Sequence, residues 1–174
     1  MVRSQLIYQK AMEIRRRYAS DSMDDIASAL GIQVVERSDF TDLLGMYIYK
    51  WRHRFIFLNA HLDDNLRQLV LAHEIGHDMF HRPLAVHGLQ EFTLFDMRGV
   101  TEYEANAFGA HLLLDDEEIL QMAHDGLDIA EMARLQNTNI NLMLIKMQEM
   151  SRLGYEFHNL PFCPRGDFLK KVKI

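Results

Sequence analysis

The chain has 174 residues, 48% of them apolar and 25% charged, which is the composition of one globular domain or of one domain with a small appendage. This composition excludes a disordered or low-complexity chain, and the net charge of −6 argues against general electrostatic attraction to nucleic acid. The single cysteine, Cys163, excludes a disulfide within the chain, and neither a signal peptide nor a membrane-spanning stretch is visible. We therefore expect a soluble cytoplasmic protein with no membrane partner.

The first sixty residues predict two helices and three strands. Apolar residues spaced three and four apart indicate an amphipathic helix over residues 6–18, and a capping pattern that begins at Ser22 indicates a second, short helix. Residues 32–36 are typical of a strand, and the aromatic and β-branched residues 46–50 and 54–59 predict a β-hairpin. The first strand of this hairpin is a candidate sheet edge, to which an extended peptide could add.

The remainder of the chain predicts helices interrupted by one long loop. Residues 63–80 are apolar on nearly every side, which is typical of a buried central helix. Residues 84–100 show no period and predict a loop, and a strong helix is expected over residues 101–114. Shorter helices are expected over residues 115–124, 128–136 and 140–153. This order predicts an α+β fold with a small β-sheet, divided into residues 1–122 and a small helical module with a tail at residues 123–174.

The central helix contains the pattern HExxH at His73, Glu74 and His77. Residues four apart lie about one turn apart, roughly 6 Å along the helix axis, so the two imidazoles can converge on one metal ion. Glu74 is angled to the side, where it can hold a water and act as a general base. Burying these polar groups on an apolar helix is costly unless they are paired or bound to metal. We therefore predict a metal site, with Zn²⁺ as the expected ion and Mn²⁺ as the alternative.

A catalytic zinc site needs a third protein ligand and keeps a fourth position for water. His81 extends the four-residue ladder but lies about 12 Å from the first histidine along a straight helix, so we expect it to support a ligand or to end the helix. Glu102 and Asn106 share one face of the next helix. We predict Glu102 as the third ligand and Asn106 as the residue that orients a ligand's other ring nitrogen. Glu104 remains the alternative ligand, although Thr101 and Glu104 also match a capping box.

Two segments, LAHEIGHDMFH at residues 71–81 and EYEANAFGAHLLL at residues 102–114, resemble the ImmA/IrrE family of metallo-endopeptidases. The usual family pattern is HExGH followed about 25 residues later by E-x-x-A-[ND]-x-F-A, and the resemblance covers roughly residues 25–120. It implies a minimal thermolysin-like, gluzincin-like fold with a central HExxH helix and a second helix that carries a ligating glutamate. Gly109 stands where alanine is common, and Leu-Asp at residues 114–115 replaces a frequent Met-Pro. Both departures leave the ligands unchanged.

The resemblance implies proteolysis of a helix-turn-helix transcriptional repressor that guards a prophage, a mobile element or a stress regulon. In this hypothesis His73, His77 and Glu102 hold the metal, while Glu74 takes a proton from the attacking water and passes it to the leaving amine. Three residues remain open candidates for a second group that stabilises the oxyanion: Tyr103, Tyr47 and His111.

The alternative function is a non-proteolytic antirepressor, which sequesters its partner through the helical part and uses the metal for structure. The lengths and spacing of the last two predicted helices resemble a helix-turn-helix. Residues 139–150 contain one lysine and no arginine, however, so DNA binding is not expected. The methionines of this region are more typical of a core than of a binding surface. Glu74 favours the peptidase, because a structural metal site needs no general base. The sequence leaves the oligomeric state open.

Overall fold

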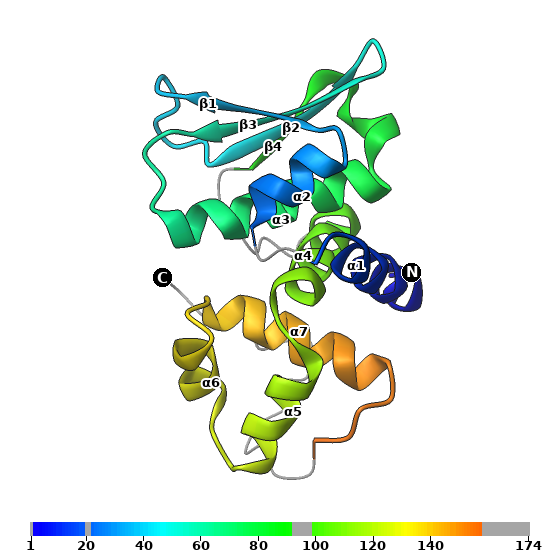
Figure 1. Ribbon diagram of the computed structural model, residues 1–174, viewed down its shortest axis with the longest axis vertical. Helices are drawn as coiled ribbons and strands as arrows, with labels where there is room; N and C mark the ends of the chain where they lie inside the picture. The colour runs from blue at the N-terminus through cyan, green and yellow to red at the C-terminus, as the bar shows by residue number, and fades with distance from the viewer. Residues whose placement is uncertain (1, 20–21, 92–98, 158–174) are drawn as a thin grey trace.

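The computed structural model describes residues 2–19, 22–91 and 99–157. Its fold is α+β, as predicted: helices cover one face of a four-stranded sheet (Figure 1). No helix within these ranges is both long enough and apolar enough to cross a membrane. The elements in chain order are α1 (Ser4–Tyr18), α2 (Met23–Ala29), β1 (Gln33–Arg37), β2 (Gly45–Lys50), β3 (His53–Asn59), α3 (Asp64–Phe80), the 3₁₀ helix η1 (Arg82–His87), β4 (Leu89–Glu91), α4 (Val100–Leu113), α5 (Asp116–His124), α6 (Ile129–Leu135) and α7 (Ile140–Arg152).

The sheet has the strand order β1-β3-β2-β4, in which β1 and β3 run parallel and the other two pairs are antiparallel. The predicted hairpin of β2 and β3 is confirmed. Trp51 and Arg52 form its turn, and both have the positive φ that favoured two-residue hairpin turns need. Tyr47, Ile56 and Leu58 are fully buried, so these strands present one face to the core.

Residues 84–100 are not the single loop that their sequence predicted. Within the described ranges they contribute to η1 and form β4, and residues 92–98 lie outside those ranges. A three-residue strand is too short to show an alternating pattern, so the sequence did not predict β4. The strand is held by its pairing with residues 45–47 of β2. That pairing also corrects the expectation that β2 is a free edge. In the described sheet the edge strands are β1 and β4.

The central helix α3 lies beneath the sheet and packs against α4 (Figure 1). Its residues 69–78 are all buried, which confirms the predicted central helix. Asp63 caps its first turn by accepting a hydrogen bond from the backbone N–H of Leu66 over 2.8 Å. Gly76 permits the close approach of α4, because an added Cβ would lie 2.9 Å from Cα of Ala105. This contact brings the first turn of α4 against the HExxH face of α3.

Two glycines at this helix contact should respond oppositely to alanine. We expect Gly76→Ala to lower the free energy of unfolding by roughly 1–3 kcal/mol, because the added methyl overlaps the α4 backbone. We expect Gly109→Ala to raise it by up to about 1 kcal/mol, because the methyl would lie in ordinary contact, 3.6 Å from Ala72, and alanine favours a helix. Urea unfolding of both variants measures the difference. Equal stability of Gly76→Ala and wild type would contradict the close packing.

The last helices gather at the end of the molecule away from the sheet (Figure 1). Helix α7 packs against α4 and α6. Lys146 of α7 is fully buried, where its Nζ donates to the carbonyl oxygen of Leu114 over 2.8 Å and to Asp116. A separately folding module at residues 123–174 stays a prediction. The expected methionine core is confirmed by four buried side chains: Met132, Met143, Met147 and Met150.

Candidate metal centre

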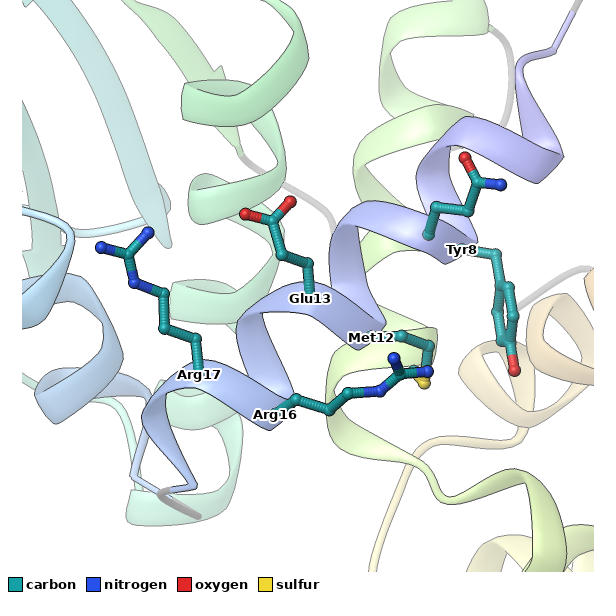
Figure 2. Close-up of a pocket in the computed structure, with 6 residues that line it drawn as sticks. Tyr8, Met12, Glu13, Arg16 and Arg17 are labelled. Atoms are coloured by element: carbon teal, nitrogen blue, oxygen red, sulfur yellow. The ribbon is translucent and has the colours of Figure 1, made fainter.

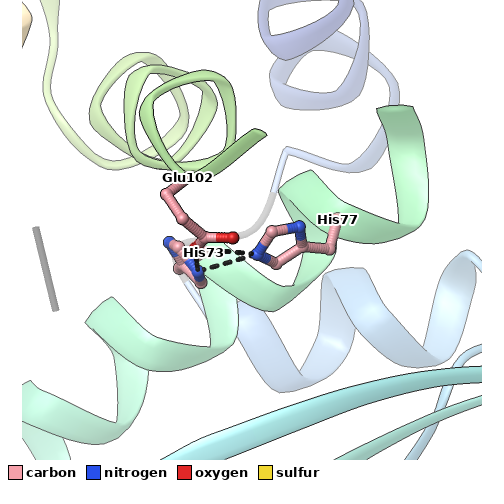
Figure 3. A group of neighbouring side chains, drawn as sticks. All are labelled: His73, His77 and Glu102. Carbon is pink, nitrogen blue, oxygen red and sulfur yellow. Dashed lines mark hydrogen bonds and ion pairs between the residues drawn. The ribbon is translucent and has the colours of Figure 1, made fainter. Parts of the chain in front are cut away.

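The three predicted ligands lie together between α3 and α4 (Figure 3). His73 and His77 come from successive turns of α3, and Glu102 comes from the first turn of α4. The Nε2 atoms of the two histidines are 3.0 Å apart, and Oε2 of Glu102 lies 3.4 Å from each of them. Two imidazole nitrogens four residues apart and a carboxylate oxygen 25 or more residues further along the sequence therefore face a common point.

These separations suit a metal ion. Two ligands at the usual Zn–N or Zn–O distance and a tetrahedral angle lie about 3.3 Å apart. Burial would raise the pKa of Glu102, but the two imidazoles hold that pKa well below its ordinary value. Burial lowers the pKa of His77 to about 4, so this imidazole is neutral and has a lone pair to donate. The described side chains thus have the atoms and the spacing that a zinc site requires, and His77 and Glu102 also have the protonation that it requires.

Asn106 orients His73 from the same face of α4 that carries Glu102, as predicted. Its Oδ1 lies 2.8 Å from Nδ1 of His73, and both side chains are buried. Because an amide oxygen only accepts, Nδ1 of His73 carries the proton and donates it. When His73 is neutral, as a metal ligand must be, the lone pair of its ring therefore lies on Nε2, which faces His77 and Glu102.

Glu104 points away from this group, toward the N-terminal segment. Its carboxylate accepts hydrogen bonds from Arg3 and lies 3.3 Å from Nε2 of His81, whose other ring nitrogen is 3.0 Å from Nδ1 of His77. His81 is also the residue that ends α3, so this expectation for it is confirmed, while its support of a ligand stays a prediction. The capping box expected at Thr101 and Glu104 is wrong: α4 begins after Gly99, and no side chain caps it.

Glu74 lies beside the group as a fully buried carboxylate. Neither of its oxygens has a hydrogen-bond partner among the described residues. Burial raises its pKa to about 8; His73 opposes this rise and the nearby acidic groups add to it. Gly45 on β2 lies against this side chain, since a Cβ there would be 2.7 Å from Oε1 of Glu74. A buried carboxyl group without a partner is costly, so Glu74 is a candidate functional residue.

Glu91 is a residue of the site that the sequence analysis missed. It lies on β4, its side chain is 7% exposed, and its Oε2 is 3.1 Å from Nε2 of His73. Burial lowers the pKa of His73, but the carboxylates of Glu102 and Glu91 outweigh it and raise that pKa to about 10. Glu74, Glu91 and Glu102 together place three acidic groups in a buried site, which favours a bound cation. No motif or spacing in the sequence signals Glu91.

The three candidates for oxyanion stabilisation are engaged elsewhere in the described structure. The hydroxyl of Tyr47 donates to Asp78 over 2.7 Å, and that of Tyr103 donates to Glu149 over 2.6 Å. The ring of His111 lies against Tyr8 and 3.3 Å from Nζ of Lys146. A hollow of about 480 Å³ lies along α1 (Figure 2), and none of its lining residues belongs to the metal group. Its lining residues are Tyr8, Gln9, Met12, Glu13, Arg16 and Arg17.

Two histidines from an HExxH helix and a glutamate from a neighbouring helix form the type of site that zinc peptidases use. The family model described as IrrE N-terminal-like domain, Peptidase M78, matches residues 27–148, from α2 into α7. The chain belongs to this family of metallopeptidases, and the predicted membership is confirmed. It is similar to the uncharacterized immunity region protein 2 of Bacillus phage phi105, with 27% identity over 141 residues, which cover 81% of this chain and 89% of that protein.

Proposed function

We propose that this protein is a zinc-dependent endopeptidase that cleaves a helix-turn-helix transcriptional repressor. The observation that carries the proposal is the buried Glu74 carboxylate, which has no partner among the described residues and lies beside the group of His73, His77 and Glu102. Burying the carboxyl group of Glu74 costs free energy, and a purely structural metal site would not need an ionisable group in that position. A hydrolytic site needs a base there.

The chain's own residues divide the chemistry between them. His73, His77 and Glu102 would hold the ion, and Asn106 fixes the ring of His73. When bound, zinc supplies a Lewis acid for the peptide carbonyl and lowers the pKa of a water toward about 7. Glu74 accepts the proton of the attacking water on a carboxylate oxygen and then donates it to the leaving amine. Mn²⁺ suits the same three ligands and is the alternative ion.

The edge of the sheet offers a binding position for an extended substrate. Strand β4 is an edge strand of the described sheet, and its Glu91 lies 3.1 Å from His73. A peptide that pairs with β4 would add a strand beside the metal group, with main-chain hydrogen bonds for affinity. The peptide-adding edge expected at β2 is therefore assigned to β4 in this proposal.

A repressor substrate is supported by one observation and one resemblance. The similar phage protein is named for an immunity region. The resemblance of residues 71–81 and 102–114 to the ImmA/IrrE family implies cleavage of repressors of mobile elements. We propose that the reaction takes place in the cytoplasm, where such repressors act. We propose no DNA binding by this chain, since its charge is −6 and α7 is packed against α4.

The proposal is tested by incubating the purified protein with the helix-turn-helix repressor encoded nearest its gene. Intact-mass spectrometry follows wild type, wild type with a chelator, and Glu74→Gln. Two repressor fragments from untreated wild type alone are expected, and their masses locate the cleaved bond. A stable complex without fragments in all three samples would instead establish the non-proteolytic antirepressor.

A further inference from the structure

The second ring nitrogen of His77 begins a chain of contacts that the proposed mechanism does not use. His77 Nδ1 lies 3.0 Å from Nδ1 of His81, and Nε2 of His81 lies 3.3 Å from Oε2 of Glu104. Arg3 holds the other side of this carboxylate. Its Nε and its backbone N–H donate to Oε1 of Glu104 over 3.2 and 3.3 Å, and its Nη2 donates to Oε2. The chain of contacts thus ends at a residue 101 positions before Glu104.

When both imidazoles are neutral, each hydrogen bond in this series of contacts can have only one donor and one acceptor. The Glu104 carboxylate only accepts, so His81 carries its proton on Nε2 and accepts at Nδ1. His77 must then donate from Nδ1, and its lone pair remains on Nε2. That atom is the one that faces Nε2 of His73 at 3.0 Å. Glu104 therefore selects, from two hydrogen bonds away, the form of His77 that can bind a metal.

We propose that Arg3, Glu104 and His81 are positioning residues that hold the ring of His77 for metal binding. The inference rests on the metal site of the proposed function. Partners that orient a ligating histidine commonly change metal affinity 10- to 100-fold. Arg3 lies outside residues 27–148, the part of the chain that matches the family model. An N-terminal segment beyond the matched domain thus completes the surroundings of the metal site.

The packing around Glu104 makes Arg3 the residue that orients it. The side chains of Glu104 and His81 are each 3% exposed, so water has little access to their contact. The guanidinium of Arg3 also lies 5.3 Å from the ring centre of Phe80, at the end of α3. Without Arg3, the carboxylate would keep His81 as its one partner among the described side chains and could rotate. Three buried residues anchor α1 in place: Ile7, Ala11 and Ile14.

The test measures zinc affinity by competition with a chromophoric chelator, so that it does not depend on peptidase activity. We expect Arg3→Gln to weaken zinc binding about 10-fold and Glu104→Gln to weaken it 10- to 100-fold. The double variant should bind no more weakly than Glu104→Gln alone, because both changes break one chain of contacts. Arg3→Lys should recover part of the affinity. The matched control is Arg15→Gln, which breaks another ion pair of α1, with Asp115, and should bind zinc as wild type does.

Nitrogen NMR of the histidine rings supplies a second measurement on the same samples. Metal-free wild type should show His77 protonated on Nδ1, and Arg3→Gln should show a mixture of both ring forms. Unchanged zinc affinity and ring form in Arg3→Gln, even with a lower melting temperature, would overturn the inference and leave the proposed function standing. A wild type that binds no zinc would overturn the proposed function and this inference with it.

Discussion

The Glu74→Gln variant is expected to bind zinc as wild type does and to lose about 10²- to 10⁴-fold in the rate of repressor cleavage. Glutamine keeps the shape of the side chain, but its amide cannot take a proton from water. The fully buried position next to Gly45 leaves no room for another group to enter and replace it. Single-turnover cleavage, with zinc content measured on the same preparation, checks both parts of the expectation.

The control for this variant is Glu117→Gln, which makes the same chemical change at an exposed position of α5. It should retain the wild-type rate and zinc content. Cleavage by Glu74→Gln at the wild-type rate would show that another group serves as the base. A loss of zinc together with activity would make Glu74 a contributor to metal binding instead.

The second large effect is expected for Glu102→Gln, which should abolish stabilisation by zinc. A ligand at 100 times its Kd stabilises the folded state by about 2.7 kcal/mol, which for a chain of this size raises Tm by roughly 5–10 °C. Wild type should show this rise on addition of zinc. Without the charged oxygen that lies 3.4 Å from both histidines, Glu102→Gln should show none. Thermal unfolding with and without zinc makes the measurement.

Glu104→Gln is the informative comparison, because Glu104 was the alternative ligand. In the proposed site its side chain acts only through His81, so zinc should still raise the Tm of this variant, although at higher zinc concentrations. The assignment of the third ligand would be reversed if zinc stabilised Glu102→Gln but failed to stabilise Glu104→Gln.

Local patterns in the sequence were sufficient for much of the fold and for the centre of the site. The hairpin and the buried central helix followed from periods of two and 3.6 residues, which backbone geometry imposes on any strand or helix. The same helical period predicted that His73 and His77 lie on one face. It also predicted that Glu102 and Asn106 share a face, as their contacts with His73 show.

Contacts between segments distant in sequence could not be predicted from the periodicity of single segments. The short strand β4 has no pattern of its own and exists through its pairing with β2, so the sequence predicted a loop there and missed Glu91. The capping box at Thr101 was wrong because the N-cap of α4 is Gly99, two residues earlier, and the carboxylate of Glu104 accepts hydrogen bonds from Arg3 instead. Spacing within one segment carries no information about such partners.

The sequence by itself determined the family and the chemical types of the candidate ligands, because these depend on residue identity and on spacing within single helices. Only the tertiary structure decided that Glu102 lies against His73 and His77, whereas Glu104 lies against His81 and Arg3. That choice depends on how closely α3 and α4 approach at Gly76 and on how they are rotated about their axes. The approach is a property of side-chain packing across the core, which forms only when the whole chain has folded.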